Sequence, residues 1–376
     1  MFLRSLVFSC SLSTLALAAP SPEMSRAVIQ NYADLVHRTY EDTLRETQGL
    51  NVAISTFLAK PSDATLQAAR LAWTAAHIQY SLTEAFRFYD GPIDGSYGVE
   101  GFINSWPVDE SYIDYVSGAP QSGIINQKDK YAKIDAGTLQ SLHEVGGDTN
   151  VATGYHALEF LLWGQDLSTT GPGARPFSDY ANQNLDSVAR RRAYLQSAAQ
   201  LLVDQMQILV KAWDPQGKDN YSARFRQEDA AVALTKIFKG ISFLMVDEVA
   251  GERMYTAYDS QSQEDEQSCF SDNTAADLVA DVQGVINVFN GNYGGVDGPG
   301  LDTLLTAAQA KRINAELQGA WSALKDLPGP FDQLILAPEG SDDRKLFLEA
   351  VFSVQDAGNS LKDAAKGLDL QLPEKP

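Results

Sequence analysis

The chain has 376 residues, of which 44% are hydrophobic and 21% are charged, a composition typical of a folded globular protein. Aspartate and glutamate outnumber lysine and arginine by 49 to 29, which gives a formal net charge of −20. Nucleic acids and anionic membrane surfaces repel such a chain, so we exclude both as partners. The charge is compatible with the binding of cations.

The first residues have the features of a secretory signal peptide. Arg4 precedes an apolar segment from Leu6 to Leu17, and Ala16-Leu17-Ala18 fits an A-x-A cleavage site. We expect residues 1–19 to be removed and the mature protein to be exported, as a soluble protein of the periplasm. No later stretch has the roughly eighteen consecutive apolar residues that a membrane helix needs.

Apolar residues recur at helical spacing along most of the chain, and Pro and Gly separate the helical stretches. We expect helices at about 24–60, 64–89, 137–146, 154–164, 184–213, 225–259, 273–290, 301–326 and 341–367. Few segments alternate as strands do, so no sheet larger than two short strands is expected. The sequence therefore predicts an all-α protein of two helical bundles packed side by side.

A loop rich in Gly, Pro and Thr at 168–176 marks the expected boundary between the bundles. The N-terminal bundle would span residues 20–175 and the C-terminal bundle residues 176–376. The first bundle includes an irregular, acidic segment at 90–135. It is too long for a plain connection, so we expect an ordered functional loop there.

A short helix from Gly154 to Gly164 is the central element of this prediction. Thr153 can cap its start and Gly164 can end it. Nearly all its side chains are large and apolar, so the helix should be buried, but His156 and Glu159 share one face. A buried carboxylate is costly unless it is paired or binds a metal. The pair is either half of a metal site or a hydrogen-bonded pair that satisfies both groups in a core.

The segment Gly154-x-His156-x-x-Glu159, followed by Phe-Leu-Leu-Trp-Gly-Gln-Asp, resembles the motif of the imelysin family, which includes iron-regulated proteins. Further stretches similar to family blocks lie at 72–94, 104–116 and 243–274. Their order along the chain is far more specific than any single motif.

The resemblance implies a fold of two helical bundles with the functional site at their junction. Relatives often have His where this chain has Gln267 and Ala275. If those histidines contribute to the function of the relatives, this chain lacks part of that function.

The favoured hypothesis is a metal-binding protein involved in iron uptake or iron handling. Carboxylate-rich sites suit hard or borderline ions, so iron is favoured, as a divalent or trivalent ion, with zinc as the alternative. The proposed ligands are His156 and Glu159, and the candidates to complete the site are Glu84, Asp94, Glu100 and Glu248. For each of these four, a surface or capping carboxylate is the alternative.

Two other functions stay open. A metallopeptidase needs three protein ligands, an open position for water and a general base. Both familiar zinc motifs fail, because Gly147 stands where H-E-x-x-H requires its second His and Phe160 follows Glu159. We rank this function lower. The third is a non-catalytic ligand-binding scaffold with a structural His–Glu pair. The expected partners are a metal ion and a membrane transport or cell-surface protein.

Overall fold

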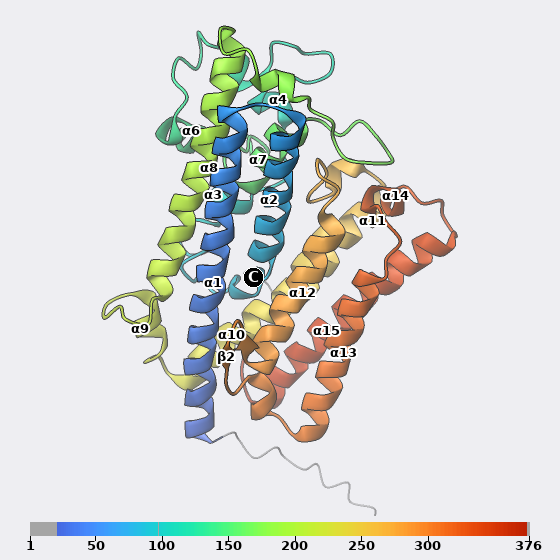
Figure 1. Cartoon of the computed structure of the whole chain (residues 1–376). Coiled ribbons are helices and arrows are strands. Elements are labelled where there is room, and N and C mark those ends of the chain that lie inside the picture. The colour runs from blue at the N-terminus through green and yellow to red at the C-terminus, as the bar shows by residue number, and fades with distance from the viewer. Residues whose placement is uncertain (1–20, 97, 374–376) are drawn as a thin grey trace, which may run out of the picture.

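The computed structural model describes residues 21–96 and 98–373, and their fold is all-α, as predicted (Figure 1). The expected signal peptide at 1–19 lies outside the described residues. Within the described part of the chain, the single sheet consists of two antiparallel strands, β1 (Asn292–Tyr293) and β2 (Val296–Asp297). The chain therefore builds its core almost entirely from helix–helix contacts.

One group of helices forms around the long N-terminal helix and stands on the left in Figure 1. Its members are α1 (Pro22–Ala59), α2 (Asp63–Ser81), α7 (Gly154–Trp163) and α8 (Asp186–Trp213). Helices α2 and α8 pack against α1, and α7 packs against α2 and α8. Ser62 separates α1 from α2, because its side chain caps the first turn of α2 in a capping box with Thr65.

A second group has its C-terminal helices on the right in Figure 1. Its members are α10 (Ala230–Phe243), the π-helical segment η3 (Leu244–Tyr255), α12 (Thr274–Asn290), α13 (Ala307–Lys325) and α15 (Asp342–Gly367). Helix α15 packs against α10, η3 and α13, and α12 packs against α13. Helix α12 also packs against α2, and α10 against α1. These contacts form the junction between the groups.

Helix α8 follows the expected boundary at 175/176 in sequence, and it packs along α1 and against α7.

Several expected helices are shorter or less regular than their apolar spacing suggests. The helix expected at 64–89 ends at Ser81, and a 3-10 turn, η1 (Glu84–Phe86), follows. The helix expected at 225–259 is divided by η3, in which backbone hydrogen bonds span five residues instead of four. The smaller helical elements are α3 (Glu100–Asn104), α4 (Glu110–Ile113), α5 (Gly123–Asn126), α6 (Ala136–Leu142), η2 (Phe177–Tyr180), α9 (Tyr221–Phe225), α11 (Thr256–Ser260), η4 (Gln263–Asp265), η5 (Leu301–Leu304) and α14 (Phe331–Ile335).

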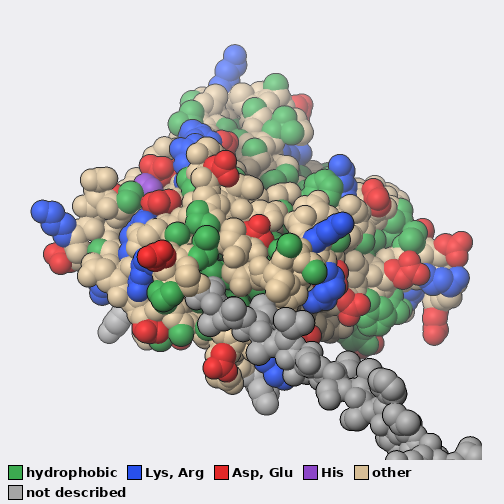
Figure 2. Space-filling model, turned by 90° about the horizontal axis from the view of Figure 1, so that it is seen from below, with side chains coloured by type: hydrophobic (Ala, Val, Ile, Leu, Met, Phe, Trp, Pro, Cys, Tyr) green, Lys and Arg blue, Asp and Glu red, His purple; other side chains and the backbone are tan. Residues whose placement is uncertain are grey.

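Charged side chains of both signs are exposed at the lower end of the molecule. Figure 2 shows the lower end of the molecule, where acidic and basic side chains are interspersed with hydrophobic ones. Among the residues that the structure describes, no helix is both long enough and apolar enough to span a membrane.

Candidate functional site

Helix α7 is buried along its whole length, which confirms the burial expected from its composition. Gly154 begins the helix with a φ of 89°, and a Cβ at this position would lie 2.5 Å from the carbonyl oxygen of Ile103. Glycine is therefore required there both by conformation and by space. Thr153 occupies the N-cap position but makes no capping hydrogen bond, contrary to expectation. Its hydroxyl donates to the carbonyl oxygen of Phe102 instead.

His156 and Glu159 form a hydrogen-bonded pair on this helix. His156 Nδ1 lies 2.8 Å from Glu159 Oε2, and the two side chains are 1% and 0% exposed. The other carboxyl oxygen, Oε1, accepts hydrogen bonds from the Ser271 backbone N–H at 2.9 Å and from its hydroxyl at 2.7 Å. His156 Nε2 is buried and has no partner. One nitrogen of the pair is thus left available for a ligand.

Burial keeps both members of this pair uncharged near neutral pH. It raises the pKa of Glu159 to about 8, although the hydrogen bonds from Ser271 oppose the shift. Burial also lowers the pKa of His156, and the neighbouring His77 lowers it further. Near pH 7 the pair therefore consists of a protonated carboxyl group and a neutral imidazole.

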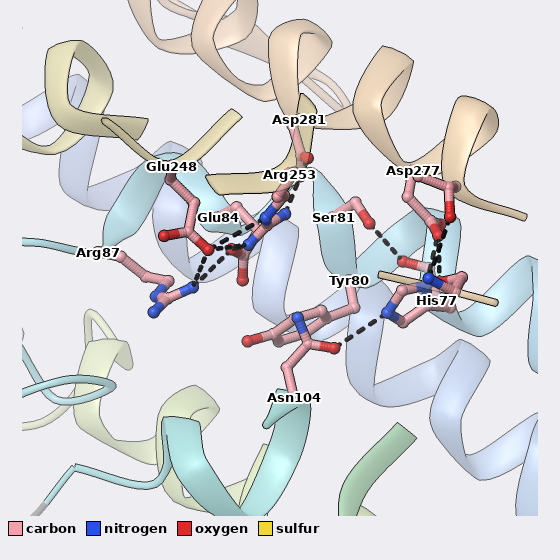
Figure 3. Close-up of polar contacts among 12 residues, drawn as sticks. His77, Tyr80, Ser81, Glu84, Arg87, Asn104, Glu248, Arg253, Asp277 and Asp281 are labelled. Carbon is pink, nitrogen blue, oxygen red and sulfur yellow. Dashed lines mark hydrogen bonds and ion pairs between the residues drawn. The ribbon is translucent and has the colours of Figure 1, made fainter. Parts of the chain in front are cut away.

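His77 on α2 lies beside this pair, with its ring centre 5.1 Å from that of His156. Its Nδ1 is 2.9 Å from Asp277 Oδ1 on α12, and its Nε2 is 3.0 Å from Asn104 Oδ1 (Figure 3). Burial lowers the pKa of His77, but Asp277 and the two hydrogen bonds outweigh burial, so the net shift is upward. The ring joins α2 to α12 across the junction. No local sequence pattern identifies these partners of His77, which lie 200 and 27 residues away.

A second buried polar cluster surrounds Arg253 of η3 (Figure 3). Its guanidinium contacts Glu84 of η1, Glu248 of η3 at 2.9 Å and Asp281 of α12 at 2.9 Å. Arg253, Glu84 and Asp281 are fully buried. Burial raises the pKa of Glu84, but Arg87 and Arg253 outweigh it and hold the pKa at about 2. Glu84 is therefore a carboxylate whose charge is compensated by arginine.

The remaining candidate carboxylates also have protein partners. Glu100 lies 3.4 Å from Arg87, which contacts Glu84 as well. Asp94 accepts hydrogen bonds from the backbone N–H groups of Phe88 and Gly91, the latter at 3.0 Å, and so organises the turn after η1. The structure thus brings Glu84, Glu100 and Glu248 together around two arginines, apart from the His156–Glu159 pair.

Glu248 pairs with a residue of its own helical segment. Arg253, five residues after Glu248, contacts it at 2.9 Å, and both residues lie on the π-helical segment η3. Glu252, four residues after Glu248, is exposed.

The segment after η4 covers α7 and contains groups that sequence reasoning did not select. Glu266 Oε1, both amide atoms of Gln267 and Asp272 Oδ1 are buried and have no hydrogen-bond partner. Burial, followed by the charge of Asp332, raises the pKa of Asp272 to about 7, and burial raises that of Glu266 well above its ordinary value. In residues 21–96 and 98–373, no group of three or more His, Cys, Asp or Glu side chains is arranged to hold a metal ion.

The all-α fold agrees with what comparison with known proteins shows. The chain belongs to the imelysin family, whose model matches residues 36–361. It is 26% identical over 334 residues to iron-regulated protein A of Synechococcus elongatus, covering 84% of this chain and 80% of that protein.

Two solved structures show the same fold. One is described as an iron-regulated protein A precursor from Parabacteroides distasonis, with a TM-score of 0.71, 16% identity, and coverage of 93% of this chain and 97% of that one. The other is an imelysin-like protein from Psychrobacter arcticum, with a TM-score of 0.65, 15% identity, and coverage of 95% and 100%.

Proposed function

We propose that this imelysin-family chain is an exported, non-catalytic protein of iron handling, and that His156 is its primary metal ligand. The supporting observation is the buried Nε2 of His156, which has no partner while Nδ1 is held by Glu159. A metal-binding imidazole usually has its second nitrogen fixed by a carboxylate in this way. In this proposal iron is the cargo, and a membrane transport or cell-surface protein would receive or deliver it.

The proposal gives Glu159 a different role from the one expected at first. Its Oε2 contacts His156 and its Oε1 is held by Ser271, so neither oxygen is free for a metal. Glu159 would therefore orient His156 and accept the Nδ1 proton, while Nε2 binds the ion. Further ligands would be water and carboxylates of the covering segment, where Glu266 and Asp272 each have an unpartnered oxygen. The residues fit part of a metal site, since the described residues hold no group of three or more His, Cys, Asp or Glu side chains arranged for a metal ion.

Binding at Nε2 should release a proton. Near pH 7 the pair holds one proton on Glu159 and one on the imidazole, because the Glu159 pKa is about 8. A metal on Nε2 leaves a single proton, which lies on Nδ1 and is shared with the Glu159 carboxylate. Metal affinity should therefore rise with pH until Glu159 ionises in the free protein.

Equilibrium dialysis against Fe(II), followed by elemental analysis, tests this function. The mature protein should bind about one equivalent, His156→Ala should lose it, and His37→Ala should keep it, because His37 lies on α1 outside both clusters. Loss of binding in both variants, or in neither, would contradict the assignment. Zn(II) is measured in parallel because zinc is the alternative ion.

Chelator-sensitive cleavage of an unfolded protein substrate would establish the metallopeptidase alternative. A wild-type protein that binds no metal at all would favour a scaffold, with the His–Glu pair as a structural element.

A further inference from the structure

A pocket of about 510 Å³ lies where the chain leaves α7. The rings of Tyr115, Trp163, Pro172 and Pro176 are part of its wall, and the charged residues Arg175 and Asp166 also line it. Its volume lies within the range of small-molecule sites, roughly 300–1,000 Å³. The pocket is therefore large enough for an organic ligand with a ring or an apolar portion.

The guanidinium of Arg175 is fixed at this pocket. Its Cζ lies 5.1 Å from the ring centres of Tyr115 and Phe160. Nη1 donates to Asp114 Oδ2 at 2.7 Å and to Asp179 Oδ2 at 3.2 Å. Only 2% of the side chain is exposed. The group is thus positioned before any ligand arrives, which lowers the entropy cost of binding.

One edge of this guanidinium has no protein partner. Among the described residues, neither Nε nor Nη2 of Arg175 donates a hydrogen bond, and Nε is buried without a partner. Gly164, with a φ of 76°, lies next to this side chain, and a Cβ there would lie 3.2 Å from Arg175 Cβ and 3.5 Å from Nε. Nε and Nη2 together form a fork that matches the two oxygens of a carboxylate.

We propose that this pocket binds a small organic carboxylate. Its two oxygens accept hydrogen bonds from Nε and Nη2 of Arg175, and its apolar or ring portion lies against Trp163 and Tyr115. A carboxylate is the ligand that satisfies a buried cationic donor most strongly, because charge-assisted hydrogen bonds gain strength where water is excluded.

The pocket is separate from the His156 site. Trp73 stands between them, with its ring centre 5.3 Å from that of Trp163 and 6.5 Å from that of His156. The carboxylate site does not depend on the metal proposal, because none of its contacts involves His156 or Glu159.

Asp166 determines which carboxylates the pocket accepts. It lines the pocket, and its Oδ1 accepts a hydrogen bond from the Ser168 backbone N–H at 2.9 Å. Its negative charge disfavours ligands with several carboxylates, so a monocarboxylate with a ring is favoured over a tricarboxylate. Neutralising Asp166 should therefore strengthen binding.

Isothermal titration of the mature protein with benzoate tests the proposal, with benzamide as the uncharged control. Benzoate should bind and benzamide should bind at least tenfold more weakly, since a hydrogen bond to a charged group contributes more than a neutral one. Asp166→Asn should bind benzoate more tightly. Arg175→Lys keeps the charge but removes the fork, and should weaken binding roughly tenfold or more.

A second variant keeps the test decisive if Arg175→Lys disturbs the contact with Asp114. Ala174 is exposed and lines the pocket, so Ala174→Trp should fill it without touching that contact. This variant should have the same denaturant midpoint of unfolding as the wild type. It should nevertheless lose benzoate binding. The proposal is overturned if benzoate does not bind the wild type, if Ala174→Trp binds it unchanged, or if benzamide binds equally well.

Discussion

The buried carboxyl group of Glu159 should make the folded protein less stable as the pH rises. The folded-state pKa is about 8 and the ordinary value is 4.5, so the native state retains a proton that the unfolded chain releases. The stabilising contribution is complete below about pH 4.5 and is lost as the pH rises to about 8. A difference of about 3.5 pH units corresponds to about 5 kcal/mol at most, since each unit is worth about 1.4 kcal/mol.

Glu159→Gln removes this dependence while it preserves the shape of the side chain. The amide oxygen can still accept hydrogen bonds from Ser271, and the amide group can donate to His156 Nδ1. Urea unfolding in the presence of a chelator, between pH 5 and pH 8, gives the free energies. The wild type should lose about 4 kcal/mol relative to the variant over this range.

A matched control is Glu252→Gln, because Glu252 is exposed on η3 and this change should leave the pH dependence of the wild type intact. Parallel stability curves for the wild type and Glu159→Gln would refute the reasoning, because Glu159 would then be ionised throughout in the folded protein.

Three further predictions concern the same region. Fe(II) affinity measured by dialysis should rise with pH up to about 8 in the wild type and should lose this dependence in Glu159→Gln, because the variant has no proton to release. Leu161→Ala should cost roughly 2–5 kcal/mol in urea unfolding while the metal content of the folded protein stays unchanged, since Leu161 is a fully buried core residue of α7. Arg253→Gln should cost about 3–5 kcal/mol in urea unfolding, because it leaves Asp281 buried without its cation and Glu84 paired with Arg87 alone. An unfolding free energy within about 1 kcal/mol of that of the wild type would show that the Asp281 carboxyl group is protonated in the native protein.

The features that the sequence predicted are those set by local spacing. The burial of α7 follows from its unbroken apolar composition, and the contact between His156 and Glu159 follows from residues three apart on a helix. The long helices α1, α8, α12 and α15 also lie within a few residues of their expected positions, because apolar spacing and capping residues are local as well.

The features that the sequence missed are set by packing between distant segments. His77 contacts Asp277, two hundred residues away, and Ser271 contacts Glu159 across 112 residues. No local pattern identifies such partners. The contact between Glu248 and Arg253, five residues apart, lies on the π-helical segment η3, which the apolar spacing of the sequence does not distinguish from an ordinary helix. Glu84 and Glu248, which were candidate metal ligands, are therefore paired with Arg253 instead.

The most direct test of the central proposal is anomalous diffraction at the iron absorption edge from crystals grown with Fe(II) at pH 8. We predict a peak about 2 Å from His156 Nε2, the usual length of a metal–imidazole bond, with Nδ1 still in contact with Glu159. Bound iron elsewhere in the molecule, with Nε2 of His156 still buried and without a ligand, would contradict the proposal.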